Sequence, residues 1–157
     1  MANFQGVAQT AGVCVETRIT GELHTSATQA ELRSIVWNLI KNAVEAVGKG
    51  GRVRVGAQAA PTHIRIVVDD DGPGMGSTHQ TQAFEPYFTT KATGSGLGLP
   101  LVRHLITRLG GELVVESELG RGTRMVVSLP LVESRHDTVS SGVRQRHPFR
   151  GLHVLLM

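Results

Sequence analysis

Apolar residues recur along the middle of the chain with two different periods, and each period predicts one type of element. Alternation of apolar and polar residues is typical of strands, whereas apolar residues spaced three and four apart are typical of amphipathic helices. Thr28 and Glu31 have the spacing of a capping box, so we expect a helix to begin there and to stop at Gly48. The pattern predicts strands at 13–19, 52–55, 63–68, 112–116 and 124–129, and helices at 28–47 and 97–109.

Both ends of the chain lack these periods. Residues 1–12 are small and polar, so we expect a flexible remnant of something larger before a domain at 13–131. Residues 132–150 predict a polar linker. Residues 151–157 are apolar again and resemble the start of a truncated receiver domain, although a hydrophobic tail or an added strand fits as well. Inside the domain, residues 76–83 are almost wholly polar, and we expect a mobile segment there.

The composition argues against several classes of function. The chain has 157 residues, enough for one domain with a hydrophobic core, and a formal net charge of +3. No basic run alternates with aromatic residues, so we expect no nucleic-acid partner. Cys14 is the single cysteine, which excludes an internal disulfide, and its place in an apolar strand predicts burial. No stretch is as long as a membrane span and no signal peptide follows Met1, so the cytoplasm is the expected location.

Three carboxylates follow the apolar run at 63–68. Asp69, Asp70 and Asp71 come directly after the strand, and Gly72-Pro73-Gly74-Met75 follows them. Glycines at 72 and 74 let a flat group approach the backbone. A calcium loop of the EF-hand type would need different spacings of glycine and glutamate. The stretch therefore indicates a binding loop at the end of a strand.

Two asparagines lie on one face of the first predicted helix. Asn38 and Asn42 are four residues apart, so their amides project from the same side. An amide oxygen can ligate Mg²⁺, which takes its other ligands from water and phosphates. Lys41 and Glu45 lie within one turn, within reach of phosphates or of the metal's water ligands. An exposed helix also tolerates asparagines, so the pair gains meaning only beside the other motifs.

Three glycines open the second predicted helix. Gly94, Gly96 and Gly98 expose backbone amides, and the helix start adds partial positive charge, which predicts a phosphate cradle. Their spacing differs from the dinucleotide fingerprint, and no Gly-Lys-Ser/Thr occurs, so Rossmann and Walker A sites are disfavoured. Residues 84–93 precede the cradle and would form a lid, in which Lys91 could reach the γ-phosphate.

Together and in this order, these motifs resemble the ATP-binding domain of the GHKL superfamily (gyrase, Hsp90, histidine kinases and MutL). They are most similar to the catalytic domain of two-component sensor histidine kinases. The resemblance covers residues 10–131 and implies an α/β (α+β) two-layer sandwich of the Bergerat type. Such a sandwich has a mixed, largely antiparallel sheet with helices on one face and an ATP lid.

The resemblance also implies ATP and Mg²⁺ as cofactors. By resemblance, Asp70 accepts a hydrogen bond from the amino group of adenine, and Thr123 supports this contact. Asn42 is the implied Mg²⁺ ligand, with Glu45 as a candidate second one, and Asn38 lines the phosphate side. The implied ATP-site residues are Asn38, Lys41, Asn42, Asp70, Gly72, Gly74, Met75, Thr89, Lys91, Gly94, Ser95, Gly96, Leu97, Gly98, Leu99 and Thr123.

Position 38 separates the activities of this superfamily. The hydrolytic branch and the serine kinases of the anti-sigma type carry a glutamate four residues before the metal asparagine. This chain has Asn38 there, which cannot act as a base. A site without a water-activating base favours transfer of the γ-phosphoryl group to a histidine on a separate dimerisation domain. An ATPase or serine kinase of the same fold and a non-catalytic nucleotide-binding module are the alternatives.

None of the seven histidines lies in the His-Glu-x-x motif that marks a phosphoacceptor helix. The sequence therefore predicts no catalytic histidine within the chain, which we expect to be a fragment or truncated reading frame of a longer, hybrid kinase. The expected partners are the missing dimerisation domain and the receiver domain of a response regulator.

Overall fold

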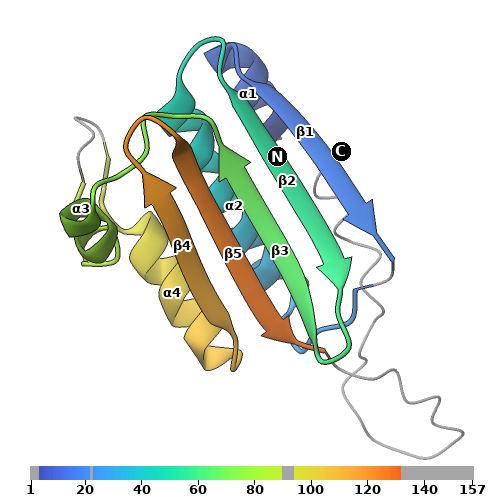
Figure 1. Ribbon diagram of the computed structural model, residues 1–157. Coiled ribbons are helices and arrows are strands. Elements are labelled where there is room, and N and C mark those ends of the chain that lie inside the picture. Colours follow the sequence, from blue (N-terminus) through green and yellow to red (C-terminus); the bar gives the residue numbers. More distant parts are fainter. Residues whose placement is uncertain (1–3, 22, 90–93, 132–157) are drawn as a thin grey trace, which may run out of the picture.

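The computed structural model describes residues 4–21, 23–89 and 94–131, and all the predicted strands and helices are present in it (Figure 1). Two further helices, α1 and α3, join them. In chain order the elements are α1 (Phe4–Ala11), β1 (Cys14–Thr20), α2 (Gln29–Val47), β2 (Arg52–Ala59), β3 (His63–Asp70), α3 (Ser77–Gln82), α4 (Gly98–Arg108), β4 (Glu112–Glu118) and β5 (Gly122–Pro130).

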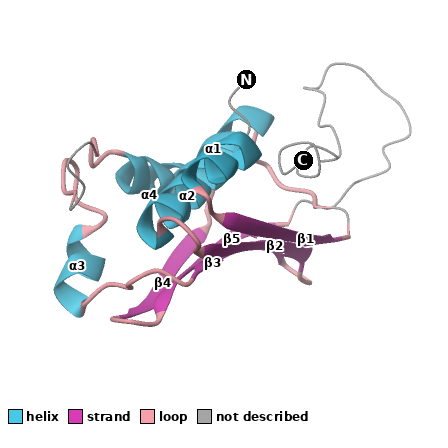
Figure 2. Ribbon diagram, turned by 90° about the horizontal axis from the view of Figure 1, so that it is seen from above, coloured by secondary structure: helices cyan, strands magenta, loops and turns pink. Residues whose placement is uncertain are grey.

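One five-stranded sheet carries the long helices on a single face. The strand order is β1-β2-β3-β5-β4, in which β1 and β2 are parallel and the other neighbouring pairs are antiparallel. Seen from above, α1, α2 and α4 lie on one side of the sheet, and α3 lies beside the end of β4 (Figure 2). The predicted two-layer α/β sandwich with a mixed, largely antiparallel sheet is confirmed.

Helix α2 packs across the middle of the sheet, and the alternation along β3 decides which side chains face it. Ile64, Ile66 and Val68 are buried, each with about 1.5–3 kcal/mol of favourable burial free energy. The same alternation continues to Asp70, so its carboxyl group also faces the helical layer. On α2 the buried residues recur at helical spacing: Leu32, Ile35, Val36, Leu39, Ile40, Ala43 and Val44.

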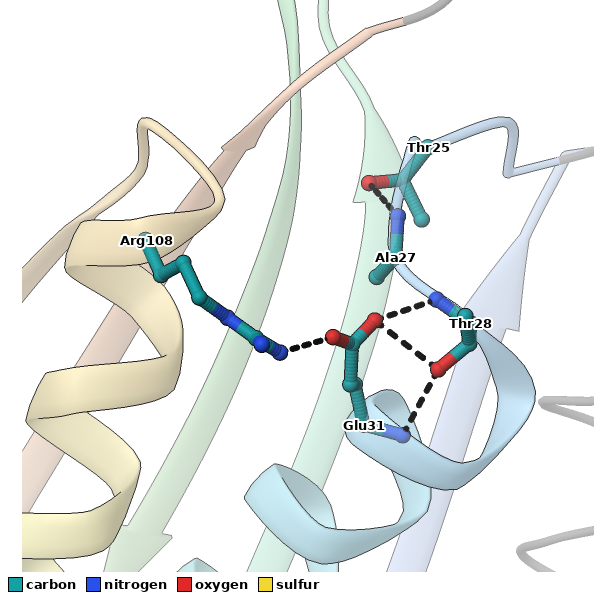
Figure 3. A network of polar contacts seen from close by, with 5 residues as sticks. All are labelled: Thr25, Ala27, Thr28, Glu31 and Arg108. Carbon is teal, nitrogen blue, oxygen red and sulfur yellow. Dashed lines mark hydrogen bonds and ion pairs between the residues drawn. The ribbon is translucent and has the colours of Figure 1, made fainter.

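A polar network holds the start of α2 against the end of α4 (Figure 3). The predicted capping box is present: Glu31 Oε2 accepts from Thr28 N at 2.7 Å, and Thr28 Oγ1 accepts from Glu31 N at 3.3 Å. The other carboxylate oxygen of Glu31 pairs with the guanidinium of Arg108 on α4. Hydrogen bonds from Thr28, helped by Arg108 against the effect of burial, hold the pKa of Glu31 below its ordinary value. The two helices that carry the asparagines and the glycine cradle are thereby joined.

The prediction of a flexible remnant over residues 1–12 is wrong for Phe4–Ala11, which form α1. Val7, Ala8 and Ala11 lie on one side of this helix and pack against the core, and Ala8 is only 3% exposed. These small residues repeat at helical spacing, but they are too few to distinguish a docked helix from a polar leader. The contact of α1 with α2 supplies the stability that the short segment lacks by itself.

Two further predictions also need correction. Residues 77–82 form the short helix α3, where we expected a mobile segment without a helix; none of its side chains is buried. Cys14 is exposed rather than buried. Its neighbours Val13 and Val15 face the helical layer, so strand alternation turns Cys14 to the opposite face.

The predicted linker at 132–150, the receiver-like segment at 151–157 and Lys91 lie outside the described residues. Among the helices that the structure describes, none combines the length and the apolar character needed to cross a bilayer.

Candidate functional site

Asp70 is the buried acid of the site, with 9% of its surface exposed at the end of β3. Its Oδ1 accepts two backbone hydrogen bonds, from Gly72 N at 3.0 Å and from Thr123 N at 3.2 Å. Asp70 and Thr123 are direct partners in the β3–β5 register. Burial raises the pKa of Asp70, and the charges of Asp71 and Asp69 add to this, while the two amides act in the opposite direction. Within the described residues, Oδ2 receives no hydrogen bond, so it can accept one from a ligand.

The glycines after Asp70 are needed because backbone packs against backbone. Gly74 has φ +67°, and a Cβ there would overlap the carbonyl oxygen of Glu118. A Cβ on Gly72 would lie 2.9 Å from Asp70 Oδ1 and 3.3 Å from the backbone of Ala46 on α2. The sequence suggested that these glycines admit a flat ligand. The structure shows that they first let the loop fit between α2 and the β4–β5 turn.

Asn38 and Asn42 lie where α2 passes the start of α4. Asn38 Nδ2 donates to Ser34 O at 2.8 Å, which leaves its Oδ1 directed at α4. A Cβ on Gly98 would come within 2.9 Å of that oxygen and within 3.8 Å of Asn42 Nδ2. Gly98 therefore lets the helix start lie close to Asn38, and a side chain at this position would displace the Asn38 amide oxygen.

Lys41 and Glu45 occupy the more exposed side of α2. Their side chains, 53% and 38% exposed, approach each other at 3.8 Å in an i, i+4 ion pair. The amide oxygen of Asn42 and the carboxylate of Glu45 are the hard oxygen donors that Mg²⁺ prefers. Among the described residues no three acids, histidines or cysteines form a metal cluster. A Mg²⁺ ion at Asn42 would accordingly take most of its ligands from phosphates and water. One amide oxygen and one nearby carboxylate are enough protein ligands for such an ion.

The glycine-rich segment before α4 packs against Tyr87, in the described part of the lid. Gly96 has φ +66°, and a Cβ there would lie 2.5 Å from the Tyr87 carbonyl carbon. Tyr87 N donates to Gly96 O at 3.1 Å, and Leu97 N donates to Ser95 Oγ at 3.4 Å. Tyr87 itself has φ +68°, unusual for a side-chain-bearing residue, and is 77% exposed. Gly94 is exposed at the start of this segment.

The remaining predicted residues flank these groups. Thr89 is exposed on the lid, Leu97 is 43% exposed, and Leu99 packs against the core. The structure thus brings the acid and the two asparagines to one face of the sheet. Gly72 after Asp70 lies against Ala46, one helical turn beyond Asn42.

A hollow of about 610 Å³ borders the acid at the end of β3. Asp70, Ser117, Thr123 and Gln80 all line it, together with charged residues of the open face, whereas Asn38 and Asn42 do not. The acid and the asparagines are therefore neighbours that do not share this hollow. Ser117 and Gln80 were not predicted from the sequence, because a lone serine and glutamine carry no motif.

Comparison with known proteins identifies the family of this chain. The model of the family described as histidine kinase-, DNA gyrase B-, and HSP90-like ATPase matches residues 27–133. The chain belongs to this family. The resemblance to the GHKL superfamily and to histidine kinase catalytic domains is therefore confirmed.

Several relatives are kinases of bacteria. Over 101 residues the chain is 40% identical to sporulation kinase C of Bacillus subtilis, which covers 64% of this chain and 24% of that protein. Over 126 residues it is 34% identical to the sensor histidine kinase ZraS of Escherichia coli K12, covering 78% and 27%. The chain spans about a quarter of the length of these relatives.

Solved structures agree with the fold. The catalytic domain of the histidine kinase ThkA superposes with a TM-score of 0.73 and 27% identity, covering 81% of this chain and 84% of that one. Full-length ShkA, solved in complex with AMPPNP, has a TM-score of 0.66 and 27% identity, covering 82% and 30%.

Proposed function

We propose that this domain binds Mg·ATP and transfers the γ-phosphoryl group to a histidine on a separate dimerisation domain. The observation that carries the proposal is the state of Asp70. It is a buried acid whose Oδ1 accepts hydrogen bonds from two backbone amides, while its Oδ2 can accept a hydrogen bond from the amino group of adenine. A 6-oxo purine would present a carbonyl oxygen to this acid and be repelled.

The phosphates would lie between α2 and the start of α4. Asn42 would hold Mg²⁺, with Glu45 as a second candidate, and Asn38 would line the phosphate side with Lys41 nearby. Gly94, Ser95, Gly96, Leu97, Gly98 and Leu99 would supply the cradle, Gly72, Gly74 and Met75 the purine loop, and Thr89 and Lys91 the lid. When bound, Mg²⁺ neutralises charge on the β- and γ-phosphates.

Asn38 supports transfer rather than hydrolysis. Its amide is not basic, and its nitrogen already donates to Ser34 O, so it has no means to deprotonate water. A histidine nitrogen needs no such help: it forms the new bond to phosphorus while the bond to the bridging oxygen breaks and ADP leaves. The receiver domain of a response regulator would then accept the phosphoryl group from that histidine.

Calorimetric titration with Mg·ATP and Mg·GTP tests the purine assignment. A charged hydrogen bond contributes about 1.5–3 kcal/mol, so Asp70→Asn should weaken ATP binding at least about tenfold. Asp69→Asn is the matched control, because Asp69 lies on the opposite face of β3 and pairs with Arg124. Equal affinity for ATP and GTP in the unchanged protein would contradict the proposal.

Incubation with labelled ATP tests the transfer. The chain alone should acquire no phosphate, whereas a histidine-bearing dimerisation domain added to it should acquire acid-labile phosphate. Steady release of inorganic phosphate without that domain would indicate an ATPase. An acid-stable product would indicate a serine kinase.

A further inference from the structure

The hydroxyl group of Ser117 lies where three segments of the site meet. Met75 N donates to Ser117 Oγ at 2.8 Å, and Ser117 Oγ donates to Gly122 O at 3.0 Å. Thr123 Oγ1 lies 2.9 Å from the same oxygen. Because a hydroxyl group has one proton and two lone pairs, these three contacts use its full capacity.

These partners determine the direction of the hydrogen bond between Ser117 and Thr123. The Gly122 carbonyl can only accept, so it takes the Ser117 proton, and the Met75 amide can only donate. Thr123 must then donate its own hydroxyl proton to Ser117. As a result Thr123 Oγ1 offers only lone pairs to any further group, next to the Asp70 carboxylate that Thr123 N also contacts.

Gln80 on α3 holds the same assembly from its other side. Its Nε2 donates to Met75 O at 2.9 Å and to Ser117 O at 2.7 Å, which uses both amide hydrogens. Met75 is thus fixed at its nitrogen by Ser117 and at its oxygen by Gln80. The link runs from α3 through the purine loop to Asp70.

We propose that Ser117 is a positioning residue for purine recognition, acting through Thr123. It commits the Thr123 proton, so that Thr123 and Asp70 together present only hydrogen-bond acceptors to the ligand. Such an edge suits the amino group of an adenine nucleotide and disfavours the carbonyl of a 6-oxo purine. This inference rests on the proposed function and adds a residue that selects the purine without touching it.

Removing the hydroxyl group should relax the selectivity. In Ser117→Ala, Thr123 loses its acceptor and can turn its proton toward a ligand carbonyl. The loss of one neutral hydrogen bond should lower the ratio of ATP to ITP affinity about two- to twelvefold. Ser117→Thr keeps the hydroxyl group and should restore the ratio. Ser128→Ala, the same change on β5 away from this network, should leave it unchanged.

Calorimetry of the full chain with Mg·ATP and Mg·ITP measures this ratio, and hydrogen exchange of the Met75 amide measures the link without a nucleotide. The amide should be protected in the unchanged protein, lose protection in Ser117→Ala and keep it in Ser117→Thr. Equal weakening of both nucleotides in Ser117→Ala, or unchanged Met75 exchange, would overturn the positioning role. Protected Met75 in a chain that binds neither nucleotide would instead overturn the proposed function, and the selectivity role with it.

Discussion

Substitution of Gly122 by alanine perturbs the fold and the candidate site at one point. Gly122 has φ +91°, and a Cβ there would overlap the carbonyl oxygen of Asp70 and lie 3.1 Å from the Cα of Asp71. These are backbone atoms at the end of β3, the strand that pairs with β5, so no side-chain rotation can relieve the contact. Gly120 lies in the same turn at φ +79° with no atom within 4 Å of its Cβ position, which makes it the matched control.

The two variants share one cost and differ in another. A left-handed backbone costs alanine about 1–2 kcal/mol at either position. Overpacking against the Asp70 backbone adds about 1–3 kcal/mol in Gly122→Ala alone. A difference of about 2 kcal/mol should separate the two melting midpoints by roughly 4–8 °C in a domain of this size. Because the overlap displaces Asp70, Gly122→Ala should also weaken ATP binding, whereas Gly120→Ala should not.

Thermal and urea unfolding of both variants, followed by titration with Mg·ATP, measure these effects. Gly122→Ala should have the lower midpoint and the lower affinity. Equal losses of stability would mean that only the left-handed backbone matters. The proposed role of the close contact between Gly122 and the Asp70 backbone would then be refuted.

Four other substitutions test stability, binding or both. Asp70→Asn should raise the free energy of unfolding at neutral pH, because burial raises the pKa of Asp70 and the folded chain bears the cost of its charge; the gain should shrink as pH falls through that raised pKa. Gly98→Ala should weaken ATP binding by displacing Asn38 Oδ1 while costing little stability, since alanine favours a helix; calorimetry and thermal unfolding read the two effects. Thr28→Ala should lower stability by about 1 kcal/mol in urea unfolding, through loss of the helix cap. Because the pKa of Glu31 is lowered in the folded chain, the charged carboxylate stabilises the fold at pH values above the ordinary pKa of glutamate. This stabilisation is lost as the pH falls through the lowered pKa, so acid should destabilise Glu31→Gln less than the unchanged protein.

Specific outcomes would contradict three of these predictions. A less stable Asp70→Asn at every pH would mean that the amide group cannot replace the carboxylate as acceptor of the two backbone hydrogen bonds. Unchanged ATP affinity in Gly98→Ala would separate the asparagines from the phosphates. Identical acid unfolding of the unchanged protein and Glu31→Gln would show that Glu31 has an ordinary pKa in the folded chain.

Much of the domain follows from local pattern alone. The period of two along residues 63–68 and the capping box at Thr28 and Glu31 each specify an element without help from the rest of the chain. Strand alternation also directs Asp70 to the helical layer, and the spacing of Asn38 and Asn42 puts both on one face of α2. The family and most of the candidate residues could therefore be predicted from short stretches with fixed spacing.

The segments whose structure depends on a distant partner were not predictable in this way. The apolar residues of α1 carry too little periodicity, and its contact with α2 makes it a helix. Helix α3 buries none of its side chains, and the hydrogen bonds of Gln80 to Met75 and Ser117 hold it in place. The local sequence of α1 or α3 therefore does not predict a helix without the contacts that the rest of the fold supplies.

By itself, the sequence determined where the five strands and the two long helices form and which residue types could serve a nucleotide, because periodicity and spacing act within one segment. Only the tertiary structure decided which groups meet. It brought Ser117 to Thr123 and Met75, set Gly72 against α2, and directed Asn38 at Gly98. Those contacts join residues far apart along the chain, and their geometry depends on the β3–β5–β4 register and on the packing of α2 against α4, which no local pattern encodes.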